Sequence, residues 1–134
     1  NKGVLDLVDA AAILRGQRYD IRVHLCGVGT AMTALKEKVH ALGLDEIVSI
    51  HGSCGRSQLL DLLGRSHVVV VPTRTDFEEG FAKTCAEGVL AGRLVVTSRV
   101  CPALEDIRDA AVEVEPNDVE GYARAFMRLI DDPR

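Results

Sequence analysis

Apolar and polar positions alternate along the 134-residue chain in two rhythms, one typical of amphipathic helices and one typical of buried strands. Near the beginning of the chain, apolar residues recur every three or four positions from Val4 to Leu14, and Gly16 ends the pattern. This spacing predicts a helix with one buried face. Further helices are predicted at 30–42, 56–66, 79–92, 103–107 and 117–132, with Ser57 as the N-cap of the second of these and Asn117 or Asp118 as the cap of the last.

Short, continuously apolar runs separate these helical segments and predict five strands. They lie at 21–27, 46–52, 67–73, 94–100 and 110–116, and the third contains four consecutive valines. Parallel neighbours require crossovers of about a dozen residues or more, which the intervening helices supply. Strands that are apolar throughout are covered on both faces. We therefore predict one α/β domain over residues 1–134, a doubly wound, Rossmann-like parallel sheet.

Composition and charge restrict the partners and the compartment. The net charge of −4 is spread along the chain without a cluster of Lys and Arg, so we expect no nucleic-acid partner. No apolar run reaches the roughly 18 residues that span a bilayer, which predicts no transmembrane segment. The four cysteines include no CxxC pair, and Cys26 and Cys85 have apolar neighbours in the sequence. This pattern indicates reduced thiols in the cytoplasm, with neither a metal site nor a disulfide.

Unusual residues follow three of the predicted strands. Ligands of open parallel sheets bind beyond the carboxyl ends of the strands. Gly27 and Gly29 follow the first strand, Gly52 and Ser53 follow the second, and a loop containing Glu79 follows the valine strand. We expect these loops to meet at one edge of the sheet, although each glycine by itself is more typical of an ordinary turn.

The segment "EGFAKTCAEGVLAG", residues 79–92, places Glu79 and Glu87 eight positions apart. Side chains tilt toward the start of a helix, so the Glu87 carboxylate leans toward amides that lack helical partners and can bind an anion. An equally open interpretation is that both glutamates are ordinary solvated helix residues. The predicted buried face comprises Phe81, Cys85, Val89, Ala82, Ala86 and Leu90.

The stretches "KGVLDLVDAA", "VHLCGVGT", "HVVVVPT" and "EEGFAKTCAEGVLAG", in this order, resemble the C-terminal donor-binding domain of the group 1 retaining glycosyltransferases. The resemblance covers nearly the whole chain. It implies one half of the two-domain GT-B architecture, with the first strand and the N-terminal acceptor domain lying outside this sequence. It also implies a nucleoside-diphosphate sugar as donor and a sugar, lipid or small molecule as acceptor. The chain alone is then expected to be inactive, and any attachment to the inner membrane would belong to the other domain.

The resemblance also implies a role for each matching residue. Glu79 would be the catalytic position beside the transferred sugar, and Glu87 would bind the ribose hydroxyls. No Asp-x-Asp occurs in the chain, so no metal cofactor is expected and the protein itself would hold the diphosphate. The remaining donor-binding positions are Lys2 at the diphosphate, Gly52 and Ser53 at the base, Gly27 and Gly29 at the rim, and the amides of Gly80, Phe81 and Ala82 at sugar and phosphate.

Two other interpretations remain open. A sugar-nucleotide epimerase or a phosphorylase would keep the fold and change the reaction, and a phosphorylase would need a pyridoxal phosphate lysine, for which no distinctive context is present. The second interpretation is a non-catalytic module that binds a dinucleotide at Gly27 and Gly29. Against it, "GVGTAM" lacks the third glycine of GxGxxG. His51, at the end of a predicted strand, either contacts a base or is hydrogen-bonded locally.

Overall fold

Helices and strands alternate along the chain, as the sequence predicts. The computed structural model describes residues 3–75 and 83–132. The predicted helix near the beginning ends at Gly16, and each predicted strand is present, although all five are shorter than expected. The elements are α1 (Val4–Gly16), β1 (Val23–Cys26), α2 (Met32–Ala41), β2 (Val48–Gly52), α3 (Arg56–Arg65), β3 (Val68–Val71), α4 (Lys83–Leu90), β4 (Leu94–Ser98), α5 (Leu104–Ile107), a 3₁₀ turn (Arg108–Ala110), β5 (Ala111–Val114) and α6 (Val119–Asp131).

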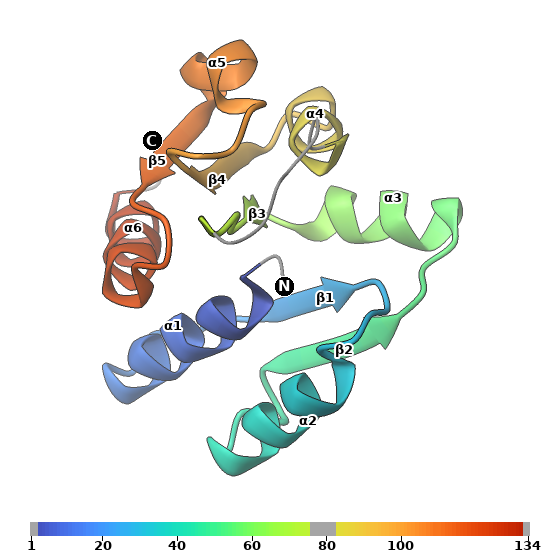
Figure 1. Ribbon diagram of the computed structural model, residues 1–134, viewed down its shortest axis with the longest axis vertical. Coiled ribbons are helices and arrows are strands. Elements are labelled where there is room, and N and C mark those ends of the chain that lie inside the picture. Colours follow the sequence, from blue (N-terminus) through green and yellow to red (C-terminus); the bar gives the residue numbers. More distant parts are fainter. Residues whose placement is uncertain (1–2, 76–82, 133–134) are drawn as a thin grey trace.

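The five strands are divided between two parallel sheets (Figure 1). One contains β1 and β2, and the other contains β3, β4 and β5 in that order. The doubly wound parallel arrangement is confirmed, but the single continuous sheet is not observed, because no ladder joins β1 to β3 among residues 3–75 and 83–132. Val70 of β3 nevertheless packs against the hydrophobic core that α1 shares with β1 and β2. The two sheets are therefore connected by side-chain packing.

Helices cover both faces of the three-stranded sheet. Alternate side chains of a strand point to opposite faces. Val69 and Val71 therefore pack with Cys85 of α4 and with α3, whereas Val70 faces α1 and α6 on the other side. The whole valine run is needed because neither face is exposed to water. Figure 1 shows α1 and α6 side by side, α1 below β3 and α6 to its left, with α4 on the opposite side of that sheet.

Two predicted helix caps have different outcomes. The side chain of Asp118 accepts a hydrogen bond from the amide of Gly121 (2.9 Å), which confirms the cap of α6. The prediction for Ser57 is wrong, because α3 begins at Arg56 and its N-cap is Gly55, two residues before Ser57. The extended backbone of Gly55 turns the chain into the helix without a side-chain acceptor, so Ser57 falls within the first turn.

Candidate functional site

The carboxyl ends of β1 and β2 meet in a pair of glycine turns. The amide of Gly27 donates a hydrogen bond to the carbonyl oxygen of Gly52 (2.6 Å), which joins the two loops directly. Both glycines have positive φ, 120° for Gly27 and 71° for Gly52, a conformation that other residues adopt only with strain. Gly29 and Ser53 lie in the same loops and are exposed. The structure therefore brings together the two glycine loops, here called the β1–β2 rim (residues 26–30 and 52–55).

A pair of histidines lies on the same two strands. Nδ1 of His24 is 2.9 Å from Nε2 of His51, and the two rings are stacked with centroids 5.2 Å apart. Burial lowers the pKa of His24, and the positive charges of His51 and Arg65 lower it further. His51 therefore has the local hydrogen bond that one of its two interpretations predicts.

The carboxyl end of β3 forms a second group, the β3 rim (residues 72–75 with Gly3, Asp6, Ser98 and Asn117). Gly3 has φ 85° at the start of α1, and a Cβ at this position would collide with the carbonyl oxygen of Pro72. One turn later, Asp6 accepts a hydrogen bond from Arg74 in an ion pair of 2.6 Å. The two side chains are only 10% and 26% exposed, so the pair is shielded from water. It connects α1 to the chain immediately after β3.

Side-chain hydrogen bonds hold the rest of the β3 rim. Nδ2 of Asn117 donates to Oγ1 of Thr75 (2.9 Å), and the Thr75 amide donates to Oδ1 of Asn117 (3.4 Å). Oγ of Ser98, at the end of β4, donates to the carbonyl oxygen of Thr73 (2.7 Å). These bonds connect β4 and the start of α6 to residues 73–75, which lead into the segment 76–82 outside the described residues.

The hydroxyl group of Tyr122 is buried near this rim. Burial raises the pKa of Tyr122, and the negative charge of Asp6 adds to the effect. Within the described part of the chain, the Tyr122 hydroxyl oxygen is the one buried side-chain polar atom without a hydrogen-bond partner. The hydroxyl group of the neighbouring Ser98 donates to Thr73 instead. Tyr122 of α6 therefore contributes a buried apolar ring and a buried hydroxyl group beside the β3 rim.

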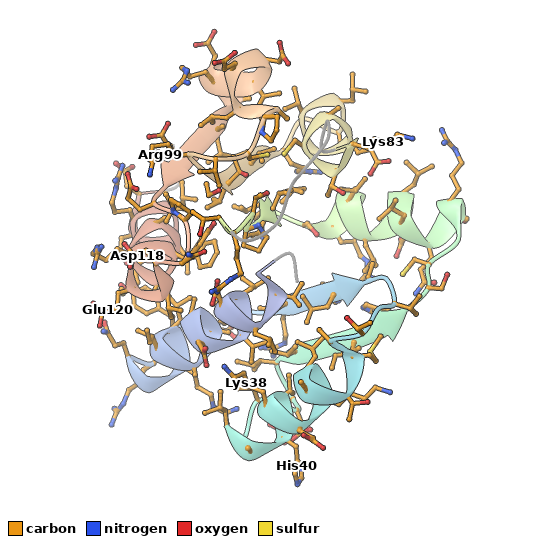
Figure 2. All side chains as sticks on the ribbon, in the orientation of Figure 1. Lys38, His40, Lys83, Arg99, Asp118 and Glu120 are labelled. Atoms are coloured by element: carbon orange, nitrogen blue, oxygen red, sulfur yellow. The ribbon has the colours of Figure 1, made fainter. Side chains whose placement is uncertain are left out.

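Helix α4 carries Glu87 on a half-buried flank. Its inner face is formed by Cys85, which is fully buried, and by Gly88, where a Cβ would lie 3.1 Å from Val69. The prediction that Leu90 belongs to this face is wrong, because Leu90 is 87% exposed. Because Gly88 has no side chain, α4 can approach β3 closely at this point. The buried face of the helix is therefore centred on Gly88 and Cys85. Lys83 is exposed and points outward (Figure 2).

Several predicted site residues lie outside the described residues. They are Lys2, Glu79, Gly80, Phe81 and Ala82. Conversely, sequence reasoning missed the roles of Asp6, Arg74 and Asn117. One signal could have revealed Asp6, because it shares a helical row with Ala10 and Leu14 and is therefore a charge on a buried face.

The described residues were also considered for metal ligands and membrane spans. Across 3–75 and 83–132, no three His, Cys, Asp or Glu side chains gather in a way that could hold a metal ion. In the same part of the chain, no helix has both the length and the apolar character needed to cross a membrane.

Comparison with known proteins identifies the family. The family model described as "Glycosyl transferases group 1" matches residues 1–134. The chain is 30% identical to a D-inositol 3-phosphate glycosyltransferase of an Arthrobacter species, over 98% of this chain and 32% of that protein. It is 28% identical to a glycogen synthase of Mycobacterium tuberculosis, with the same coverage. The chain thus spans about a third of the length of these curated relatives.

Solved structures give the same result for the fold. A glycosyltransferase from Rickettsia africae superposes with a TM-score of 0.86 at 26% identity, over 97% of this chain and 34% of that one. The Anabaena protein HepE, solved in complex with UDP, superposes with a TM-score of 0.84 at 22% identity, over 99% of this chain and 36% of that one. Such neighbours are GT-B glycosyltransferase domains. The epimerase, phosphorylase and dinucleotide-module interpretations gain no support from these matches. The chain belongs to the group 1 glycosyltransferase family.

Proposed function

We propose that residues 1–134 are the donor-binding half of a retaining glycosyltransferase that transfers a sugar from a nucleoside diphosphate to an acceptor. The observation that carries the proposal is the junction of Gly27 with Gly52, because it places two exposed glycine loops at the carboxyl rim where nucleotides bind in such folds. The solved relative HepE contains UDP. Membership of the family makes glycosyl transfer the reaction that these features support best.

The proposed roles follow the family pattern. Glu87 binds ribose, Glu79 lies beside the transferred sugar, and Ser53 and Gly52 meet the base. Lys2 and the amides of residues 80–82 hold the diphosphate. As the leaving diphosphate gains negative charge and the anomeric carbon becomes cationic, donors fixed in advance at the phosphates stabilise the transition state. The groups would come from the start of α1, the loop after β2, and α4 with the segment before it.

The test is a nucleotide titration of the full-length protein, with UDP, GDP, ADP and NAD as probes. We expect one of the nucleoside diphosphates to bind and Glu87→Gln to weaken that binding, because a ribose contact exists before and during the reaction. Glu46→Gln is the matched control, since Glu46 is exposed and precedes β2 at the opposite end of the strand. Preferential binding of NAD, or equal effects of the two variants, would contradict the assignment.

A metal-independent reaction is part of the proposal. The positive charge at the diphosphate would then come from Lys2 and from the start of a helix, which contributes roughly half an elementary charge. We expect the full-length enzyme to remain active in excess EDTA and to lose most activity on Lys2→Ala. Activity that disappears with EDTA and returns with Mg²⁺ or Mn²⁺ would count against this mechanism.

The domain organisation is also a proposal. β1 pairs only with β2, and β3 pairs only with β4, among residues 3–75 and 83–132, so each has one edge without a strand partner. We propose that a strand from outside the described residues lies between them and joins the two sheets, and that an acceptor domain completes the active site. Slow hydrogen exchange at the β1 and β3 amides in the full-length protein is the expected result, and fast exchange at both would argue against it.

A further inference from the structure

The cysteines of the chain form two pairs, which are distant in sequence and adjacent in space. Cys85 of α4 and Cys101, after β4, have their sulfur atoms 4.0 Å apart in the core, where the residues are 0% and 3% exposed. Cys26 and Cys54 form the other pair, at the β1–β2 rim, where Cys26 is exposed and Cys54 is half-buried. The two pairs therefore differ mainly in access to solvent.

Backbone contacts around Gly52 bring Cys26 and Cys54 together. Cys26 is the ladder partner of Gly52 at the end of the β1–β2 pairing. Cys54 turns back toward the same residue, because its thiol donates to the carbonyl oxygen of Gly52 at 3.7 Å. Both cysteines therefore lie against Gly52. Because neighbouring strands lie about 4.8 Å apart, Cys26 is about that far from Gly52, the residue that the Cys54 thiol contacts.

The two thiols have different chemical roles. Although Cys26 is exposed, partial desolvation of its thiol, together with the neighbouring Cys54 thiol, raises the pKa of Cys26 to about 12. Cys26 therefore keeps its proton at neutral pH, and because the thiolate is the nucleophile, it does not make the first attack on an oxidant. That step falls to Cys54, and Cys26 is in place to act second.

We propose that Cys26 and Cys54 are a reversible dithiol–disulfide site. The oxidant is a small disulfide such as oxidised glutathione. Cys54, as thiolate, attacks one glutathione sulfur, forms a mixed disulfide and releases the other glutathione as its thiolate. Cys26 then loses its proton to solvent, attacks the Cys54 sulfur and displaces the second glutathione. Two thiols of the protein are oxidised, and one glutathione disulfide is reduced to two thiols.

The new bond would connect the end of β1 to the loop after β2. Both glycine turns, at Gly27 and Gly52, lie between the linked positions, so the cross-link would restrict the β1–β2 rim. A loss of nucleotide binding on oxidation is the expected consequence, and this consequence alone rests on the proposed function.

The test is peptide mass mapping of the full-length protein after treatment with oxidised glutathione and alkylation without reductant. We expect a Cys26–Cys54 linked peptide, lighter by two hydrogens than the two thiol peptides and restored by dithiothreitol. Cys26→Ser should trap glutathione on Cys54, and Cys54→Ser should leave Cys26 largely unmodified. Cys85→Ser is the matched control and should leave the linked peptide unchanged. Alkylation of both Cys26 and Cys54 after treatment, or preferential linkage of Cys85 to Cys101, would overturn the proposal.

A UDP titration of the reduced and oxidised protein tests the consequence separately. We expect the oxidised form to lose UDP affinity and dithiothreitol to restore it. Formation of the linked peptide with unchanged UDP affinity would refute control of the rim while leaving the disulfide site established. Absence of UDP, GDP and ADP binding in both forms would refute the proposed function and not the redox chemistry.

Discussion

The two rims lie at the carboxyl ends of strands in the same domain, but different forces hold them. At the β3 rim, a shielded Asp6–Arg74 ion pair and the hydrogen bonds of Asn117 and Ser98 connect the chain after β3 to three other elements. At the β1–β2 rim, the main connection is one backbone hydrogen bond between glycine turns, and Val28 beside it is 75% exposed. Side-chain networks shielded from water produce a specific geometry, whereas an exposed glycine loop can adjust to what it binds.

Two ion pairs on α1 have the same N–O distance but differ in their exposure to solvent. Asp6–Arg74 and Asp9–Lys38 both measure 2.6 Å. The side chains of the first pair are 10% and 26% exposed for Asp6 and Arg74, and those of the second are 35% and 32% exposed for Asp9 and Lys38. Shielding from solvent, and not the separation of the atoms, determines how much each pair matters to the fold.

The largest effect should come from adding a methyl group at the glycines of the two rims. Gly3→Ala should lower the free energy of unfolding by about 3 kcal/mol or more, because positive φ and a steric collision with Pro72 act together. Gly52→Ala, whose Cβ would point into open space, should lower it by only about 1 kcal/mol through φ alone. Chemical denaturation measures both, and equal losses would show that the rims are not held differently.

Removing charge from the two ion pairs should give the next largest difference. Asp6→Asn should lower the free energy of unfolding by about 2 kcal/mol, since it removes the Asp6 charge from a pair that is shielded from water. Asp9→Asn keeps the same shape change on the same helix and should cost about 0.5 kcal/mol or less. Urea midpoints with unchanged slopes would measure the difference, and a larger loss for Asp9→Asn would reverse the comparison.

A smaller effect is expected where Asn117 holds Thr75. Asn117 has φ 63°, so Asn117→Gly keeps the backbone conformation and removes only the side-chain hydrogen bonds. We expect a loss of about 1 kcal/mol and faster hydrogen exchange at the Thr75 amide. Asn117→Asp retains an acceptor for that amide and should be intermediate. Unchanged exchange in Asn117→Gly would show that this bond does not hold the β3 rim.

The smallest effect concerns the histidines beside the β1–β2 rim. Because the pKa of His24 is lowered by burial and then by His51 and Arg65, the unfolded chain binds this proton more readily than the folded protein. Stability should therefore be present above the ordinary histidine pKa of about 6.5 and decrease as the pH falls below it. His24→Gln should reduce the fall in melting temperature between about pH 7.5 and about pH 5. Equal pH profiles in the two proteins would contradict this.

Local patterns allowed most elements to be predicted, because helices and strands follow from periodicity within one segment. The valine run of β3 and the Asp118 cap of α6 are examples in which near neighbours determine the structure. The predictions for Ser57 and Leu90 were wrong because these positions depend on features that the local apolar pattern does not contain. The start of α3 depends on the backbone of Gly55, and the inner face of α4 depends on how closely Gly88 approaches Val69. Neither contact is visible in helical spacing.

The amino-acid sequence is enough to predict the alternation of elements, the parallel α/β class and the position of Gly27 and Gly52 after successive strands. These features depend on residues close together along the chain, where spacing and turn preference act directly. Tertiary packing determines that the strands divide into two sheets, that Asp6 meets Arg74 across 68 positions, and that Cys26 and Cys54 both lie against Gly52. Such contacts depend on how several elements pack at once, and that packing buries one ion pair while leaving its neighbour on the same helix in contact with water.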